Sequence, residues 1–129
     1  MKPLNPDTLS VPRGYNNGML AEPGRILFVA GQVGWDREEK MAEGLVAQFD
    51  QALLNILEVV RAAGGTAESI GRFTLFIKDK REYAELRKEI GAVYRKHMGR
   101  HYPAMSLVVV QDLLEDGARV EIEATAVIS

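Results

Sequence analysis

The amino-acid sequence predicts one α+β domain spanning residues 1–129, in which two helices pack on one face of a mixed sheet. Two long segments carry apolar residues at helical spacing, and shorter apolar or alternating segments lie before, between and after them. The resulting order is strand, strand, helix, strand, helix, strand, strand. Two helices can cover one face of a sheet of about four to six strands, so the other face lacks cover from the chain itself.

The N-terminal part of the chain predicts two strands. Residues 1–13 contain three prolines, which is typical of an extended lead-in, and residues 15–20 can form a short strand. Residues 25–30 (RILFVA) are apolar almost throughout, as in a strand covered on both faces, and this strand is expected to end at Gly31-Gln32. Gly31 is either a plain turn residue or a position where another group approaches the backbone closely.

The middle of the chain predicts two helices with a strand between them. Apolar residues recur at helical spacing over residues 43–63, and Gly64 supplies the C-terminal stop. Residues 72–78 follow as a strand. The second helix is expected to run over residues 79–99, because it begins with the capping-box-like pattern Asp-x-x-Glu and carries apolar residues along one side.

The tail, residues 101–128, predicts two strands joined by a polar turn at residues 115–117. The second strand alternates strictly from Val120 onward, so one set of apolar side chains faces a core. Glu121 and Glu123 then lie on the opposite face. Two interpretations stay open at this point: the carboxylates belong to a solvated outer face, or they line a pocket.

The second face of the sheet is too apolar to remain in water as one contiguous patch. Its apolar residues are Phe28 or its neighbours, Phe76, Val108 or Val110, and Val127. Self-association with cyclic symmetry is an economical way to cover such a face. Glu121 and Glu123 would then lie at or near a cleft between copies, where a partly desolvated carboxylate can serve as a general base.

The composition excludes several classes of function. The chain has 47% hydrophobic and 26% charged residues, and its net charge of −2 provides no basic stripe for nucleic acid. It has no cysteine, which excludes disulfides and thiolate sites. No apolar run approaches the roughly 18–20 residues of a membrane span, and the N-terminus lacks a signal-peptide core. We therefore expect a cytoplasmic protein without nucleic-acid or membrane partners.

Several kinds of active site are also excluded by the sequence. The glycines match neither the dinucleotide-binding nor the phosphate-loop spacing. His97 and His101 are four residues apart, as in a helical metal pair, but no third ligand lies nearby, so we expect no metal site. Ser106 has no obvious histidine partner, which makes a nucleophilic triad a poor interpretation.

A site built from a carboxylate and the backbone remains. In it, Glu121 acts as a base or holds a water molecule, Gly31 offers a backbone contact and Tyr15 donates a hydroxyl hydrogen bond. Trp35 is either a packing cap or a wall of the cleft. Such a site suits hydrolytic chemistry on a small polarised C=N group, with a small-molecule metabolite as substrate.

The same residues resemble the RidA/YjgF family of reactive-intermediate deaminases over nearly the whole chain. The matching motifs are Gly14-Tyr15, LFVAGQ at 27–32, Gln48 to Asn55-Ile56, Ala62-Ala-Gly64, FIKD at 76–79 with Tyr83, Tyr102-Pro-Ala104 and VEIEA at 120–124. The resemblance implies a chorismate-mutase-like fold (bacillus type) and a homotrimer with sites between neighbouring subunits. It also implies hydrolysis of enamines and imines of 2-oxo acids to the oxo acid and ammonia, without a cofactor.

Residue by residue, the resemblance places the family's tyrosine on Tyr15, its backbone-binding glycine on Gly31 and its water-activating glutamate on Glu121. Tyr83 and Tyr102 lie in matching motifs. With Met105 and Trp35, these two tyrosines complete the substrate-binding set that we expect.

The sequence departs from the deaminating members at the residues that bind the substrate carboxylate. Those members have Pro-Ala-Arg-Ser-Cys, in which the arginine clamps the carboxylate, whereas this chain has Met105 and Leu107 in the arginine and cysteine positions. An asparagine at the start of the second helix is replaced by Ala84. Loss of a desolvated arginine–carboxylate pair costs about 2–5 kcal/mol. We therefore expect an arginine-lacking branch whose substrate is not a small 2-imino acid.

Three functions compete on the sequence alone. The first is a cleft that hydrolyses, or at least binds, a bulkier and more apolar imine, enamine or carbonyl metabolite, because a buried thioether favours apolar ligands. The second is a non-enzymatic ligand-binding or regulatory trimer that uses the same cleft. The third, RNA cleavage, is disfavoured by the isoelectric point of about 5.7.

Overall fold

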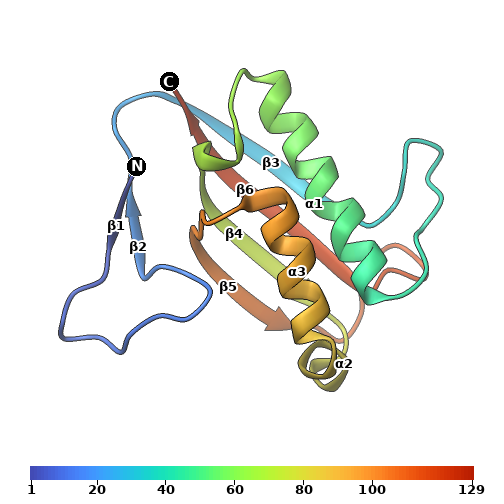
Figure 1. The fold of residues 1–129 in the computed structure, drawn as a ribbon. Helices are drawn as coiled ribbons and strands as arrows, with labels where there is room; N and C mark the ends of the chain where they lie inside the picture. Colours follow the sequence, from blue (N-terminus) through green and yellow to red (C-terminus); the bar gives the residue numbers. More distant parts are fainter.

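A four-stranded sheet with its helices on one face forms the body of the molecule, as a computed structural model of residues 1–129 shows (Figure 1). Its elements are β3 (Arg25–Val33), α1 (Leu45–Ala62), the 3₁₀ turn η1 (Ala67–Ser69), β4 (Ile70–Ile77), α2 (Lys80–Glu85), α3 (Arg87–Met98), β5 (Ala104–Val109) and β6 (Val120–Ile128). The strands lie in the order β3-β6-β4-β5, with β6 antiparallel to both neighbours and β4 parallel to β5. The predicted α+β class with a mixed sheet is confirmed.

The apolar stripe of α1 packs on the sheet and forms much of the core. Phe49, Leu53 and Ile56 recur at helical spacing and are fully buried. They belong to one core cluster with the inward side chains of the sheet, such as Phe73 of β4 and Ile122 of β6. Burial of each such side chain contributes roughly 1.5–3 kcal/mol relative to exposure. No helix of the chain, α1 included, has the length and apolar character needed to cross a membrane.

The predicted second helix is divided into two, so the molecule has three α-helices instead of two. α2 ends at Glu85. The next residue, Leu86, has a φ of −102° and a ψ of 13°, which interrupt the helix, and α3 begins at Arg87. The carboxylate of Asp79 caps α2 by accepting hydrogen bonds from the backbone N–H groups of Arg81 and Glu82 at 2.9 and 3.1 Å. α3 instead follows the core through buried residues such as Ile90. Because the two segments are held by different contacts, the chain bends between them.

The strand β3 is longer than predicted, because it continues through Gly31-Gln32 to Val33. Its register with β6 shifts between Val29 and Gln32, which leaves Ala30 and Gly31 in a β-bulge. A bulge inserts extra backbone into one strand without ending the pairing, so a glycine at this point did not mark the end of the strand. The expected end of the strand at Gly31-Gln32 was therefore wrong.

The N-terminal residues form a second, small sheet, although we predicted an unpaired lead-in. β1 (Lys2–Leu4) pairs antiparallel with β2 (Gly18–Leu20) beside the main sheet (Figure 1). The side chain of Asn5 holds the loop between them together, since it donates to Oδ1 of Asn16 and accepts from the backbone N–H of Asn17, both at 2.8 Å. Strand pairing over this distance in the chain is not visible in local sequence patterns.

The two strands of the tail form as predicted, but they are not neighbours. β4 lies between β5 and β6 in the sheet. In β6 the burial pattern alternates along the whole strand, with Ile122 and Ala124 buried and Glu123 exposed between them. The alternation predicted from the sequence is therefore confirmed.

The face of the sheet opposite the helices carries large apolar side chains that nothing in the chain covers. Phe28 is 78% exposed, Ile26 is 62% exposed and Val108 is 40% exposed. Phe76 and Val127 lie on the same face and are half-buried. The prediction of an uncovered apolar sheet face is thus confirmed for the single chain.

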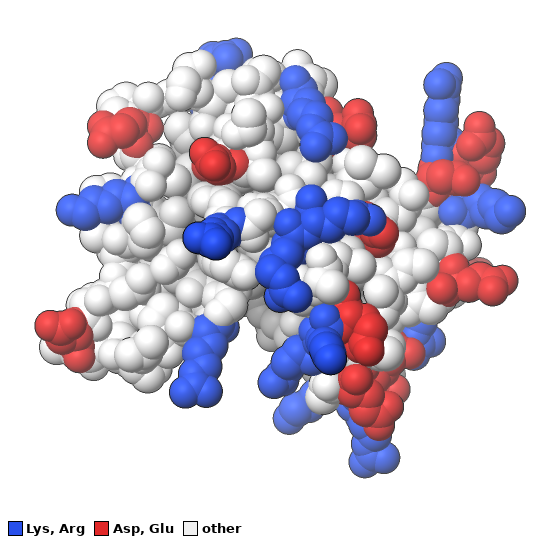
Figure 2. Space-filling view, viewed as in Figure 1, with Lys and Arg blue, Asp and Glu red and all other residues white.

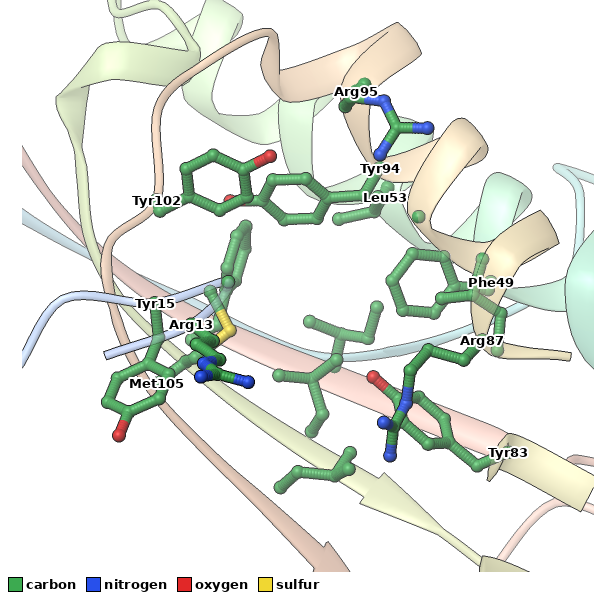
Figure 3. A pocket seen from close by; sticks show the side chains of 17 residues that line it. Arg13, Tyr15, Phe49, Leu53, Tyr83, Arg87, Tyr94, Arg95, Tyr102 and Met105 are labelled. Carbon is green, nitrogen blue, oxygen red and sulfur yellow. The ribbon is translucent and has the colours of Figure 1, made fainter. Parts of the chain in front are cut away.

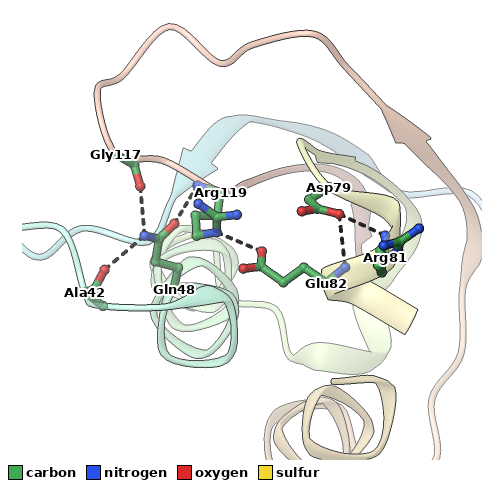
Figure 4. A network of polar contacts seen from close by, with 7 residues as sticks. All are labelled: Ala42, Gln48, Asp79, Arg81, Glu82, Gly117 and Arg119. Atoms are coloured by element: carbon green, nitrogen blue, oxygen red, sulfur yellow. Dashed lines mark hydrogen bonds and ion pairs between the residues drawn. The ribbon is translucent and has the colours of Figure 1, made fainter. Parts of the chain in front are cut away.

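A buried glutamine ties α1 to the segment before β6 (Figure 4). Gln48 is only 2% exposed. Its Nε2 donates to the carbonyl oxygens of Ala42 and Gly117, both at 3.0 Å, and its Oε1 accepts from the backbone N–H of Arg119 at 2.7 Å. The side chain of Arg119 in turn donates to Oε1 of Glu82 at 2.7 Å. No buried side-chain nitrogen or oxygen of the chain lacks a hydrogen-bond partner, as buried polar groups require.

Candidate functional site

A cavity of about 630 Å³ opens between the helices, β4, β5 and the segment before β2 (Figure 3). Its wall is mostly apolar, and all four tyrosines of the chain contribute to it. The lining residues are Arg13, Gly14, Tyr15, Phe49, Leu53, Phe73, Leu75, Tyr83, Arg87, Ile90, Gly91, Tyr94, Arg95, Tyr102, Met105, Leu107 and Ile122. A volume of this size accommodates a small molecule.

Four of the seven expected site residues meet in this cavity: Tyr15, Tyr83, Tyr102 and Met105. Met105 and Leu107 of β5 are both on the helix side of the sheet, because Met105 pairs with the buried Phe73 of β4. Both side chains therefore form part of the cavity wall, to which they contribute an apolar thioether and an isobutyl group.

Hydrogen bonds from Asn16 hold Tyr15 at the rim of the cavity. Nδ2 of Asn16 donates to the carbonyl oxygen of Tyr102 at 2.6 Å, and the backbone N–H of Asn16 donates to the carbonyl oxygen of Pro103 at 3.3 Å. These bonds join the N-terminal segment to the start of β5. The hydroxyl of Tyr15 points away from the middle of the cavity (Figure 3). Within one copy, this hydroxyl therefore does not face a ligand in the cavity, although we expected it to donate a hydrogen bond there.

Two stacked rings form another wall. The rings of Tyr94 and Tyr102 are 5.1 Å apart between centroids, with an angle of 12° between their planes. The hydroxyl of Tyr94 donates to the carbonyl oxygen of His101 at 2.6 Å. Burial, together with the neighbouring Tyr102, raises the pKa of Tyr94 well above its ordinary value, so this phenol stays protonated. The wall is thus a fixed aromatic surface.

Three arginines reach the same cavity, and none of them belongs to the expected set of site residues. Arg13 lies on the side of Met105, whereas Arg87 lies on the side of Tyr83 (Figure 3). Arg95 completes the set from the next turns of α3. The side chain of Arg87 extends toward the ring of Tyr83 (Figure 3). Burial raises the pKa of Tyr83, and the charge of Arg87 lowers it in part. Basic side chains gather over the middle of this face (Figure 2).

The other basic residues that flank the expected site lie elsewhere. Arg119 is engaged with Glu82, and a ring nitrogen of His101 lies 2.6 Å from the carbonyl oxygen of Ile70. Nε2 of His97 contacts the carboxylate of Asp50, so the two histidines serve separate structural contacts. No group of three or more His, Asp or Glu side chains is arranged to hold a metal ion.

Glu121 and Gly31 meet each other but lie outside the cavity. Glu121 pairs with Phe76 of β4 and projects from the face opposite the buried Ile122. An added Cβ on Gly31 would overlap Oε1 of Glu121 and lie 2.9 Å from its Cδ, so the absence of a side chain at Gly31 leaves room for the carboxylate. Of the two interpretations of Gly31, the close approach of another group is the one that holds. The group that approaches is Glu121 itself.

Trp35 also lies away from the cavity. It forms an isolated bridge with Met41 in the loop after β3, and its carbonyl oxygen accepts a hydrogen bond from Nδ2 of Asn55 at 2.9 Å. The same side chain donates to the carbonyl oxygen of Val33 at 3.2 Å. Within one chain, Trp35 therefore caps a loop and does not line the cavity with the tyrosines.

The fold and the site define a class of small α+β proteins. Such a protein has a ligand-sized cavity on one side of its sheet and a carboxylate–glycine pair on the other side. The chain belongs to the family whose model is described as Endoribonuclease L-PSP, the RidA/YjgF family, which matches residues 7–128.

Known relatives agree with this membership. The 2-iminobutanoate/2-iminopropanoate deaminase of Salmonella typhimurium is 34% identical over 105 residues, which cover 81% of this chain and 80% of the relative. Among solved structures, a Yersinia pestis protein of unknown function from the conserved Rid family, YyfB, has a TM-score of 0.84, 32% identity and 98% coverage of both chains. Escherichia coli TdcF, solved with bound serine, has a TM-score of 0.72 and 28% identity, covering 93% of this chain and 91% of its own.

Proposed function

We propose that three copies of this chain associate and that each site forms where the cavity of one copy meets Glu121 and Gly31 of the next. The observation that carries this proposal is the division of the expected site between the two faces of one sheet. Met105 and the tyrosines lie on the helix side, and Glu121 lies on the other side. A side chain cannot reach a ligand through its own sheet, so a complete site needs a second copy.

The apolar outer face gives the driving force for this association. Phe28, Ile26 and Val108 are exposed on the same face as Glu121. Removing apolar surface from water contributes about 25 cal/mol per Å². Packing this face against a neighbour would therefore bury these side chains and bring Glu121 into a partly dry cleft. A closed ring of three copies also agrees with the assembly that the resemblance to the RidA/YjgF family implies.

The chemistry of such a site is hydrolysis of a C=N bond. Glu121 takes a proton from a water molecule, whose oxygen adds to the imine carbon. Glu121 returns this proton to the imine nitrogen, which gives a carbinolamine. The hydroxyl proton of the carbinolamine then passes through Glu121 to the amine, the carbon–nitrogen bond breaks, and a carbonyl compound and ammonia leave. Hydrolysis needs no external oxidant or reductant, and one carboxylate can carry both protons. General acid–base catalysis of this kind contributes roughly 10²–10⁴-fold in rate.

The cavity wall favours a larger and more apolar substrate than the 2-imino acids named for the curated relatives. Met105 and Leu107 replace the charged and thiol side chains of the deaminating motif, and tyrosine rings form much of the remaining wall. We therefore assign as substrate an imine or enamine with an apolar body. A second candidate, ligand binding without turnover, is favoured by the bound serine in the related TdcF structure.

The test compares two carboxylates of β6 that lie on the same face. An amino-acid oxidase generates the imine of phenylalanine in the presence of the protein, and the appearance of ammonia is followed. Glu121→Gln should lower the rate at least roughly 100-fold, while the matched variant Glu123→Gln, which changes an exposed side chain two residues away, should keep it. Binding without any hydrolysis by the wild type would favour the second candidate.

A further inference from the structure

The hydroxyl of Tyr83 is a hydrogen-bonding group inside the cavity that the fold does not use. It points toward the middle of the cavity (Figure 3) and forms no hydrogen bond within the chain. Two other tyrosines of the wall differ, because the hydroxyl of Tyr94 donates to the carbonyl oxygen of His101 and that of Tyr15 points away from the middle. No fully buried side-chain oxygen of the chain lacks a partner, so the free hydroxyl of Tyr83 is open to a ligand that enters the cavity.

The polar side chains that line the cavity are hydrogen-bond donors. They belong to tyrosines and arginines, and the lining contains no acidic or amide side chain, no serine or threonine and no histidine. A guanidinium donates hydrogen bonds and accepts none. Burial raises the pKa of Tyr83, so its phenol stays protonated and can donate as well. The cavity therefore suits a ligand that presents an acceptor oxygen.

Tyr83 lies on the side of the cavity opposite the expected reacting end of the ligand. Tyr15, which the resemblance places in the same site as the glutamate of the next copy, lies with Met105 on one side, and Tyr83 lies with Arg87 on the other (Figure 3). The sheet side chains that line the cavity are apolar: Phe73, Leu75, Leu107 and Ile122. A ligand that reacts near Tyr15 and extends over this apolar floor brings its far end to Tyr83.

We propose that Tyr83 selects ligands whose apolar body ends in an acceptor oxygen, such as that of a phenol, by donating a hydrogen bond to this oxygen. This assignment rests on the proposed function, because it specifies the far end of the substrate of the same cavity. The positive charge of Arg87 beside the ring also favours an oxygen atom there and disfavours an amine. A purely apolar end of similar size would leave the hydroxyl of Tyr83 without a partner, which weakens binding.

The experiment measures binding of two ketones, 4-hydroxyphenylacetone and phenylacetone, by titration calorimetry. The ketones differ by one oxygen at the far end, and neither carries a carboxylate or can be hydrolysed. Wild-type protein should bind the hydroxylated ketone about tenfold more tightly. Tyr83→Phe removes only a hydroxyl and should lower this ratio below about twofold. The matched control, Tyr94→Phe, removes a cavity hydroxyl that is already bonded to His101 and should keep the ratio.

Equal binding of the two ketones by the wild type overturns the proposal, and so does the absence of binding of both. A ratio that survives Tyr83→Phe, or one that the control also loses, overturns it as well. Loss of the ratio in Tyr102→Phe instead would assign the donor to the ring that stacks on Tyr94. Since the hydroxyl of Tyr83 has no partner in the chain, circular dichroism should show a folded Tyr83→Phe variant.

The preference for the hydroxylated ketone and the hydrolysis of an imine can fail separately. A ratio that depends on Tyr83, without hydrolysis of the phenylalanine imine, contradicts the proposed function alone. Hydrolysis of this imine by a wild-type protein that binds both ketones equally contradicts only the role of Tyr83.

Discussion

Two groups of arginines on this molecule differ in where their partners come from. The backbone N–H of Arg119 donates to Gln48 and its side chain donates to Glu82, and this hydrogen bond to the Glu82 carboxylate raises the pKa of the guanidinium. Arg87 and Arg95 have no acidic partner and face a cavity. The comparison teaches that a charge satisfied within the chain serves the fold, whereas an unpaired charge beside a cavity is available for a ligand. Substitution in the paired cluster should therefore affect stability, and substitution of an unpaired arginine beside the cavity should affect ligand binding.

The largest effect on stability is expected at Gln48, the buried side chain that accepts a hydrogen bond from the backbone of Arg119. Gln48→Leu removes three hydrogen bonds and leaves the N–H of Arg119 and the carbonyls of Ala42 and Gly117 without this partner. We expect the free energy of unfolding to fall by about 3 kcal/mol, measured by urea denaturation. Arg95→Gln in the open group should change it by less than about 0.5 kcal/mol. Equal losses in the free energy of unfolding in the two variants would contradict the distinction between the paired cluster and the unpaired arginines.

A new charge in the cavity should change activity with little effect on stability. Met105→Arg restores the cation that the deaminating motif has at this position, on a wall that already contains Tyr15 and Tyr102. Hydrolysis of 2-iminopropanoate, which we expect to be poor in the wild type, should rise about tenfold. The gain is partial because Leu107 and Ala84 remain. Strong activity of the wild type on this small imine would instead mean that one of the three cavity arginines already anchors its carboxylate.

The smallest effect is expected at Gly91, where a substitution should raise stability. Gly91→Ala replaces a helix-interior glycine and should stabilise α3 by up to about 1 kcal/mol. The added methyl group would meet Nη1 of Arg95 at 3.3 Å, and the end of this flexible side chain can move aside. Urea denaturation measures the gain in the free energy of unfolding. A loss of stability would show that Arg95 is held in place.

Much of the fold follows from local patterns in the sequence. The helical spacing of apolar residues in α1 and the strict alternation of β6 both translate directly into burial. The uncovered sheet face could be foreseen because two helical patterns are too few to cover both faces. The pairing of β1 with β2 and the bulge at Gly31 could not, since both depend on hydrogen bonds between segments that are distant in the chain.

The candidate site was predicted in part, and the missing part has a physical reason. Tyr15, Tyr83, Tyr102 and Met105 do line one cavity, but the separation of Met105 from Glu121 by the sheet depends on the register among β4, β5 and β6, which the sequence does not reveal. The α3 arginines were missed because the sequence does not reveal which side of the second helix borders the cavity. The four-residue spacing of Arg87 and Arg95, which places both on one side of a helix, was the available signal.

The central claim, that each site takes its cavity from one copy and its glutamate from another, can be tested by mixing two inactive variants. Glu121→Gln lacks the base, and Met105→Trp fills the cavity. If the two halves come from different copies, co-expressed mixed trimers contain sites with one intact cavity and one intact glutamate, and random assembly predicts roughly one quarter of the wild-type rate of phenylalanine-imine hydrolysis. Mixed trimers verified by mass spectrometry that show no recovery above either variant alone would contradict the claim.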